Sequence, residues 1–186
     1  SDMKPTADYF TAAIPEPWQI LGLRLKSFSL GHYRILKRFK CAFVDDETSQ
    51  VTREDLIFGV LVCSMTPKEF MQLLNEGDLV GEAQKWGEKC GLFDLNEKAQ
   101  LFKDYIDAHS VVPPYWEGEE GKPSGAHWAQ CVESTLRSKL GWTDEEIDTQ
   151  PLSKAFADYF KQAESDGMIK LMTPDEIKLT EAQCPD

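Results

Sequence analysis

Residues 141–152, GWTDEEIDTQPL, combine acids that could do chemistry with residues that begin and end helices. Neighbouring carboxylates can serve as general acid and general base when their surroundings drive their pKa values apart. Asp144, Glu145 and Glu146 follow Thr143, however, and the spacing of Thr143 and Glu146 is that of a helix capping box. In the first turn of a helix, negative charge stabilises the helix dipole by roughly 0.3–1 kcal/mol without any catalytic part. We therefore predict a joint between helices here and not a catalytic site.

Three further residues, His109, His127 and Cys131, have side chains that bind metals. His127 and Cys131 stand four residues apart, which places both on one face of a helix. Zinc takes three or four protein ligands, and His109 is the candidate third. A metal-dependent enzyme is therefore the third of our hypotheses. Because the chain also lacks a glycine-rich phosphate loop, we predict a protein that is not an enzyme and uses no metal or cofactor.

The elements that must position these residues are mostly helices. Thr52 with Asp55, and Thr66 with Glu69, have capping-box spacing. The run from Leu56 to Cys63 is apolar on every side, which favours a central buried helix. Such signals, with apolar residues recurring at threes and fours, predict helices at 29–44, 52–63, 66–74, 78–89, 96–109, 126–140, 143–149 and 151–165, and a weak one after 173.

The fold class that we expect is mostly α: a compact multi-helix domain with an extended N-terminal arm. Whether the domain also contains one short β-hairpin or strand pair is left undecided by the sequence. We divide the chain into a flexible tail (1–13), an N-terminal helical region (14–111), a Pro/Gly-rich loop or linker (112–125) and a C-terminal helical region (126–186). The two helical regions are expected to form one globular unit. The PPYW segment at 113–116 is either a stiff hinge or a polyproline-type ligand.

The net charge of −12 is unevenly distributed. Residues 1–44 carry +4 and residues 45–186 carry −16, so the body repels phosphate groups and a nucleic-acid-binding role is disfavoured. The basic exception is the helix expected at 29–44, with Arg34, Lys37 and Arg38. Its charges are either a solvated face or a surface for an acidic partner, anionic lipid or nucleic acid.

The five cysteines are odd in number, widely spaced and without a CxxC pair. This pattern is typical of reduced thiols and therefore of a reducing compartment. No run of 18 apolar residues exists, so no membrane span is expected. If Ser1-Asp2 is a vector remnant before a native Met3, the protein has no secretory leader, and we predict a cytoplasmic location.

The segment LGWTDEEIDTQPLSKAFADYF resembles the tail-assembly chaperones of tailed phages and prophages. The matching positions form a Gly-Trp-Thr start, two acids and a Pro-Leu restart: Gly141, Trp142, Thr143, Glu145, Glu146, Pro151 and Leu152. The N-terminal PWQILGLRLKSFSLGHYRIL also looks like the opening of small phage-related proteins. The resemblance implies a small helical cytoplasmic protein that binds the long tape-measure protein, helps tail-tube subunits polymerise around it and then leaves.

Our first hypothesis is therefore a non-enzymatic assembly chaperone or adaptor of phage-like origin. A groove between the helices expected at 126–140 and 151–165 would receive an apolar partner helix. Trp128, Trp142 and Phe156 are the candidate anchors, with core packing as the alternative for each. The second hypothesis is a regulatory module that contacts nucleic acid or anionic membrane through Arg34, Lys37 and Arg38. Whether the protein forms homo-oligomers is a question that the sequence leaves open.

Overall fold

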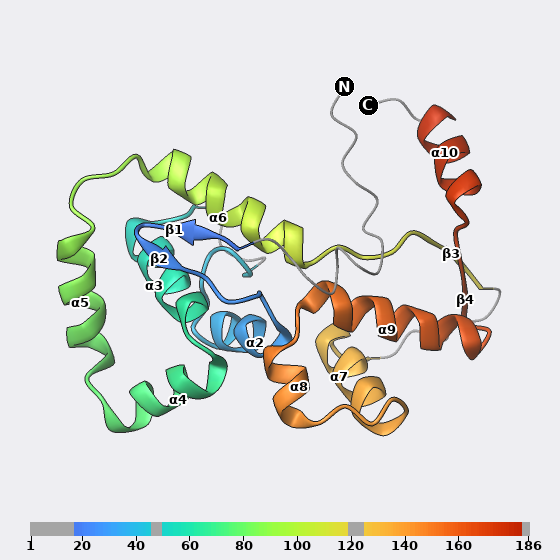
Figure 1. Cartoon of the computed structure of the whole chain (residues 1–186), viewed down its shortest axis with the longest axis horizontal. Coiled ribbons are helices and arrows are strands. Elements are labelled where there is room, and N and C mark those ends of the chain that lie inside the picture. The colour runs from blue at the N-terminus through green and yellow to red at the C-terminus, as the bar shows by residue number, and fades with distance from the viewer. Residues whose placement is uncertain (1–16, 46–49, 119–124, 184–186) are drawn as a thin grey trace.

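The computed structural model describes residues 17–45, 50–118 and 125–183 of the chain (Figure 1). The described part is mostly α, as expected, with two small antiparallel sheets. Its helices are α2 (Leu30–Arg38), α3 (Arg53–Ser64), α4 (Pro67–Glu76), α5 (Leu79–Lys89), α6 (Leu95–His109), α7 (Trp128–Ser138), α8 (Asp144–Thr149), α9 (Leu152–Ser165) and α10 (Pro174–Gln183). The expected tail, 1–13, lies outside the described residues.

The N-terminal arm folds into a two-residue hairpin, β1 (Gln19–Ile20) with β2 (Leu23–Arg24). Leu21 and Gly22 form its turn with φ of 50° and 81°, the positive values that match the twist of paired strands. Lys26 N then donates to the carbonyl of Cys63 at the end of α3 at 2.8 Å. The arm is therefore pinned to the buried helix and not left extended in solvent.

The capping signals read from the sequence begin helices in the structure. The side chains of Thr52, Thr66 and Thr143 each accept a hydrogen bond from the backbone N–H three residues on. The carboxylate of that third residue in turn accepts from the backbone N–H of the threonine. The box at Thr52 works with Asp55, whose shorter side chain still reaches back to the backbone N–H of Thr52 at 3.0 Å. Because these contacts are local, helix starts are well determined by sequence.

The helix expected at 29–44 ends early, at Arg38. Lys40 adopts φ of 52°, and the backbone N–H groups of Lys40 and Cys41 bond to the carbonyls of Lys37 and Leu36 at 3.1 and 3.0 Å. This is the Schellman arrangement that terminates helices, here without the usual glycine. The helical spacing of apolar residues extends to Phe43 because residues of the following turn also pack on the core. The sequence pattern alone does not distinguish this turn from a further turn of helix.

One hydrophobic core joins the two helical regions. Phe28, Phe102 and Tyr105 are almost fully buried, and the Tyr105 ring contacts the rings of the other two. Leu136 of α7 and Leu152 of α9 belong to the same cluster. At the N-terminus of α2, a Cβ on Gly31 would lie 2.6 Å from the Pro67 side chain and 2.9 Å from the Asp148 carbonyl. Glycine therefore permits the close approach of α2 to α4 and α8.

The segment expected as a loop, 112–125, contains a strand. β3 (Tyr115–Glu117) pairs antiparallel with β4 (Ile169–Leu171), in the register Tyr115 to Leu171. A three-residue strand has too little local pattern to be predicted, and its partner lies more than fifty residues away. The sheet stands beside the C-terminal end of α9 in Figure 1, with α10 beyond it.

Within the described residues, no helix by itself has the length and apolar content to cross a membrane. α3 and α4 meet that measure only together, and the pair is bent by 114°. Much of α3 lies in the core, where apolar side chains on every side are expected of a buried helix.

Candidate functional site

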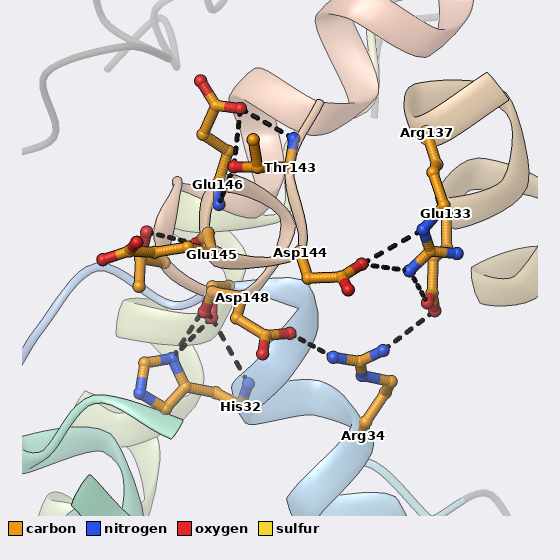
Figure 2. Close-up of polar contacts among 11 residues, drawn as sticks. His32, Arg34, Glu133, Arg137, Thr143, Asp144, Glu145, Glu146 and Asp148 are labelled. Carbon is orange, nitrogen blue, oxygen red and sulfur yellow. Dashed lines mark hydrogen bonds and ion pairs between the residues drawn. The ribbon is translucent and has the colours of Figure 1, made fainter. Parts of the chain in front are cut away.

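Three of the four acids of residues 141–152 are engaged in a cap or in ion pairs, namely Asp144, Glu146 and Asp148 (Figure 2). Thr143 N donates to Glu146 Oε2 at 2.8 Å, and Glu146 N donates to Thr143 Oγ1 at 3.2 Å. The bonds from Thr143 lower the pKa of Glu146 because they stabilise its charged form. Asp144 accepts from Arg137 Nη2 at 2.6 Å. These carboxylates therefore have structural partners at the exposed start of α8.

A chain of alternating charges connects α8 to α2 and α7 (Figure 2). Arg34 pairs with Asp148 and, at 3.0 Å, with Glu133. Glu133 also pairs with Arg137 at 2.9 Å, and Arg137 reaches Asp144. Both guanidinium side chains are more than two-fifths exposed, so solvent screens these ion pairs. The chain of charges orients the three helices and adds little to stability.

Beside this ion-pair chain lies a buried histidine that our sequence analysis did not single out. His32 is 1% exposed, accepts from Ser29 N at 3.2 Å through Nδ1 and donates to the Met65 carbonyl at 2.8 Å through Nε2. Ser29 Oγ donates to the Asp148 carbonyl at 2.5 Å. Burial lowers the pKa of His32 to about 4. The available signal was a histidine at the capping-box position three residues after Ser29, where Glu is usual.

Trp142 lies in the joint between α7 and α8. Its side chain is half-buried and packs against the core, and Lys154 Nζ lies 5.3 Å from its ring centroid. That geometry is a cation–π contact. Trp142 is not among the residues that line the groove described next, so the structure separates it from the other two candidate anchors.

Trp128 and Phe156 line a groove of about 840 Å³ between α7, α9 and the β3–β4 sheet. A row of aromatic rings, which we call the aromatic row, begins at Tyr33, outside the described groove lining, and continues along the groove through Trp128, Phe156, Phe160 and Tyr115. Successive ring centroids lie 4.7 Å apart for Tyr33 and Trp128, 5.5 Å for Trp128 and Phe156, 6.4 Å for Phe156 and Phe160, and 4.9 Å for Phe160 and Tyr115. The groove expected between these helices is thus present, with a sheet wall that was not expected.

The floor of the groove belongs to the core and its mouth is open. Phe156 is 7% exposed, whereas Trp128 is 39% and Met168 54% exposed. Contiguous apolar side chains at a surface commonly mark a binding site. Among the described lining residues, Glu117 is the single charged side chain. This composition suits the binding of an apolar surface.

The sheet wall depends on a close backbone contact at Gly118. Gly118 N donates to the Met168 carbonyl at 3.1 Å, and a Cβ on Gly118 would lie 2.3 Å from that oxygen. We expect Gly118→Ala to push β3 from β4 and to lower the free energy of unfolding by about 1–3 kcal/mol in urea titrations. Gly125→Ala is the matched control, because a Cβ there meets no atom within 4 Å. Equal effects of the two changes would contradict the role of Gly118.

The three basic candidates have different surroundings. Arg34 belongs to the ion-pair chain, and Lys37 Nζ pairs with Asp45 Oδ1 at 3.1 Å. Arg38 is exposed and forms no ion pair with any residue in the described ranges. It lines a cleft of about 530 Å³ whose walls carry both signs of charge, with Lys68 on α4 and Glu145 on α8. Partial neutralisation of α2 weakens the physical case for binding to polyanions.

The three candidate metal ligands have different roles in the structure. His109 is buried and its Nδ1 lies 2.7 Å from the Tyr105 carbonyl, whereas His127 accepts from Ala129 N at 3.2 Å and caps α7. Cys131 lines the groove. Within residues 17–45, 50–118 and 125–183, no group of three or more His, Cys, Asp or Glu side chains is placed to hold a metal ion.

The groove and the joint are the features on which a function can be based. The chain matches no protein-family model, no curated protein and no solved structure. The resemblance to tail-assembly chaperones therefore depends on the sequence of residues 140–160 and 17–36, while the groove is an independent structural feature.

Proposed function

We propose that this protein is a non-enzymatic helical adaptor of the assembly-chaperone type, which binds an apolar helix of a partner protein in the groove between α7, α9 and the β3–β4 sheet. The aromatic row is the observation that carries this proposal. Aromatic side chains supply much of the binding energy at protein interfaces, and a partner helix presents anchors at i, i+3 or i+4, and i+7 to such a groove. Trp128 and Met168, at the mouth, are accessible to such anchors.

The resemblance to phage proteins suggests which helix this would be. In such a system the partner is the tape-measure protein, a long helical chain around which tail-tube subunits polymerise. A cytoplasmic location is part of the proposal. Cys41, Cys63 and Cys90 are free thiols, and burial raises the pKa of Cys41 to about 11, which keeps that thiol protonated and unreactive.

The proposal is tested by co-expression with the helical proteins encoded by neighbouring genes, followed by affinity purification. We expect a defined tape-measure-like partner to be retained in a fixed ratio to this protein. Gene neighbours of tail-tube and tape-measure type would agree with that result. Failure of the wild-type protein to retain any of these candidates, or a metabolic operon around the gene, would count against the proposal.

A further inference from the structure

We infer that the groove selects a cationic amphipathic helix, one that carries Lys or Arg beside its apolar face; this inference rests on the proposed function. Glu117 is exposed at the end of β3 and is the single charged residue among the described groove lining. Its carboxylate forms no ion pair with any residue of the described ranges. Among the described residues, the groove therefore offers an apolar surface with one negative charge at its edge that has no ion-pair partner.

The cations near the groove are engaged elsewhere. Lys139, just after α7, pairs with Asp166 at 2.5 Å, Lys161 of α9 pairs with Glu164 at 2.5 Å, and Lys170 of β4 pairs with Glu176 at 2.8 Å. Arg137 belongs to the ion-pair chain, and Lys154 lies over Trp142. No described lysine or arginine of α7, α9 or β4 is thus left to neutralise Glu117, and a partner's cation can do so.

The position of Glu117 relative to the aromatic row fits a helical ligand. Tyr115 and Glu117 both line the groove, and Trp116 between them does not, as strand alternation requires. Two residues along a strand span about 7 Å, close to the pitch of an α-helix, about 5.4 Å. A helix whose apolar residue lies on Tyr115 and Phe160 can therefore place a basic residue, about one turn away, beside Glu117.

The charge of the whole molecule acts in the same direction. A net charge of −12 attracts a cationic segment and repels an acidic one, and this attraction weakens with added salt. The exposed face of Trp128 adds a site at which a Lys or Arg side chain can make a cation–π contact. Nucleic acid and anionic lipid are disfavoured at this groove for the same electrostatic reason.

The test uses two synthetic helical peptides with the same apolar face, one with Lys and Arg and the other with Glu at the positions that border this face. We expect wild-type protein to bind the cationic peptide at least about tenfold more tightly in calorimetric titrations at low salt, with a smaller preference at about 0.5 M salt. Glu117→Lys should remove most of that preference. Glu88→Lys changes the net charge equally on α5, which lies on the other side of the molecule from β4 (Figure 1), and should remove little.

The possible results separate the inference from the proposed function. Equal affinity for the two peptides, or equal effects of Glu117→Lys and Glu88→Lys, would overturn the selection of cationic helices and leave the groove as a helix-binding site. If wild-type protein binds neither peptide, the helix-binding function of the groove is itself overturned. Binding of the cationic peptide that depends on Glu117 supports both.

Discussion

Replacing Trp128 by alanine is expected to weaken binding of the cationic amphipathic peptide by about 30-fold or more, which corresponds to a hot-spot loss of about 2 kcal/mol. Trp128 lies between Tyr33 and Phe156 in the aromatic row, with ring centroids 4.7 and 5.5 Å away, and remains 39% exposed. A large ring that is held in place before binding loses little entropy when a partner covers it. Its removal should therefore affect the complex more than the free protein.

The matched control is Trp116→Ala. Trp116 is exposed to a similar extent, 46%, but lies outside the described groove lining. We expect the control to change peptide affinity less than about threefold, and both variants to keep the helical circular-dichroism spectrum of the wild type. If Trp116→Ala weakens binding as much as Trp128→Ala does, the groove is not where the peptide binds. The same pair of variants can be applied to the co-purified partner.

Lowering the pH from 7 to about 4 is expected to remove about 3 kcal/mol of stability through His32 alone. Burial holds the pKa of His32 at about 4, against 6.5 for an exposed histidine, so the unfolded chain takes up a proton before the folded protein does. This contribution is complete above pH 6.5 and is lost as the pH falls through the interval from 6.5 to 4. Burial also lowers the pKa of His109, which adds to the loss in the same direction.

Two carboxyls act in the opposite direction. Partial burial raises the pKa values of Asp148 and Asp158, so folding favours their protonated forms, and their own contributions become more favourable as the pH falls. Asp148 faces Arg34, whose charge opposes that rise. The net effect on stability between pH 6.5 and 4 is nevertheless a loss, because His32 has the largest shift toward the neutral form among these groups and is almost fully buried.

The measurement is the free energy of unfolding in urea at a series of pH values. His32→Gln should flatten the decline, because an amide can accept from Ser29 N and donate to the Met65 carbonyl without titrating. His127→Gln changes an exposed ring, so most of the decline in the free energy of unfolding should remain in that variant. Should the first variant not fold, the imidazole signals of wild-type protein followed by NMR give the same answer. A His32 ring that becomes protonated near pH 6.5 in the folded protein would contradict the prediction.

Most helix starts could be read from the sequence. Thr52, Thr66 and Thr143 are caps because a side-chain oxygen and a backbone N–H three residues on meet within one turn, whatever the rest of the fold does. The apolar run of α3 likewise predicted a buried helix. The end of α2 was not predicted, because Lys40 takes the left-handed conformation that glycine usually provides, and no local signal marked it.

The candidate site was predicted in part. Spacing along α7 and α9 identified Trp128 and Phe156 as neighbours on facing helices, and the structure places both in the groove. The same reasoning grouped Trp142 with them, although a cation–π contact and core packing hold it in the joint. The sequence pattern predicts a loop at Tyr115, whereas in the structure its ring packs on Phe160 as part of the groove wall.

The sequence by itself determined the helical class, the helix starts, the acidic body and the helix ends and starts within residues 141–152. Each of these depends on composition or on contacts within one helical turn. Only the tertiary structure decided that β3 pairs with β4, that His32 is buried and neutral, and which tryptophan lines a groove. These features depend on contacts between different elements of the chain, as with His32 of α2 and Met65, which are 33 positions apart. Burial and charge compensation at such distances are set by the packing of whole elements, which no local pattern records.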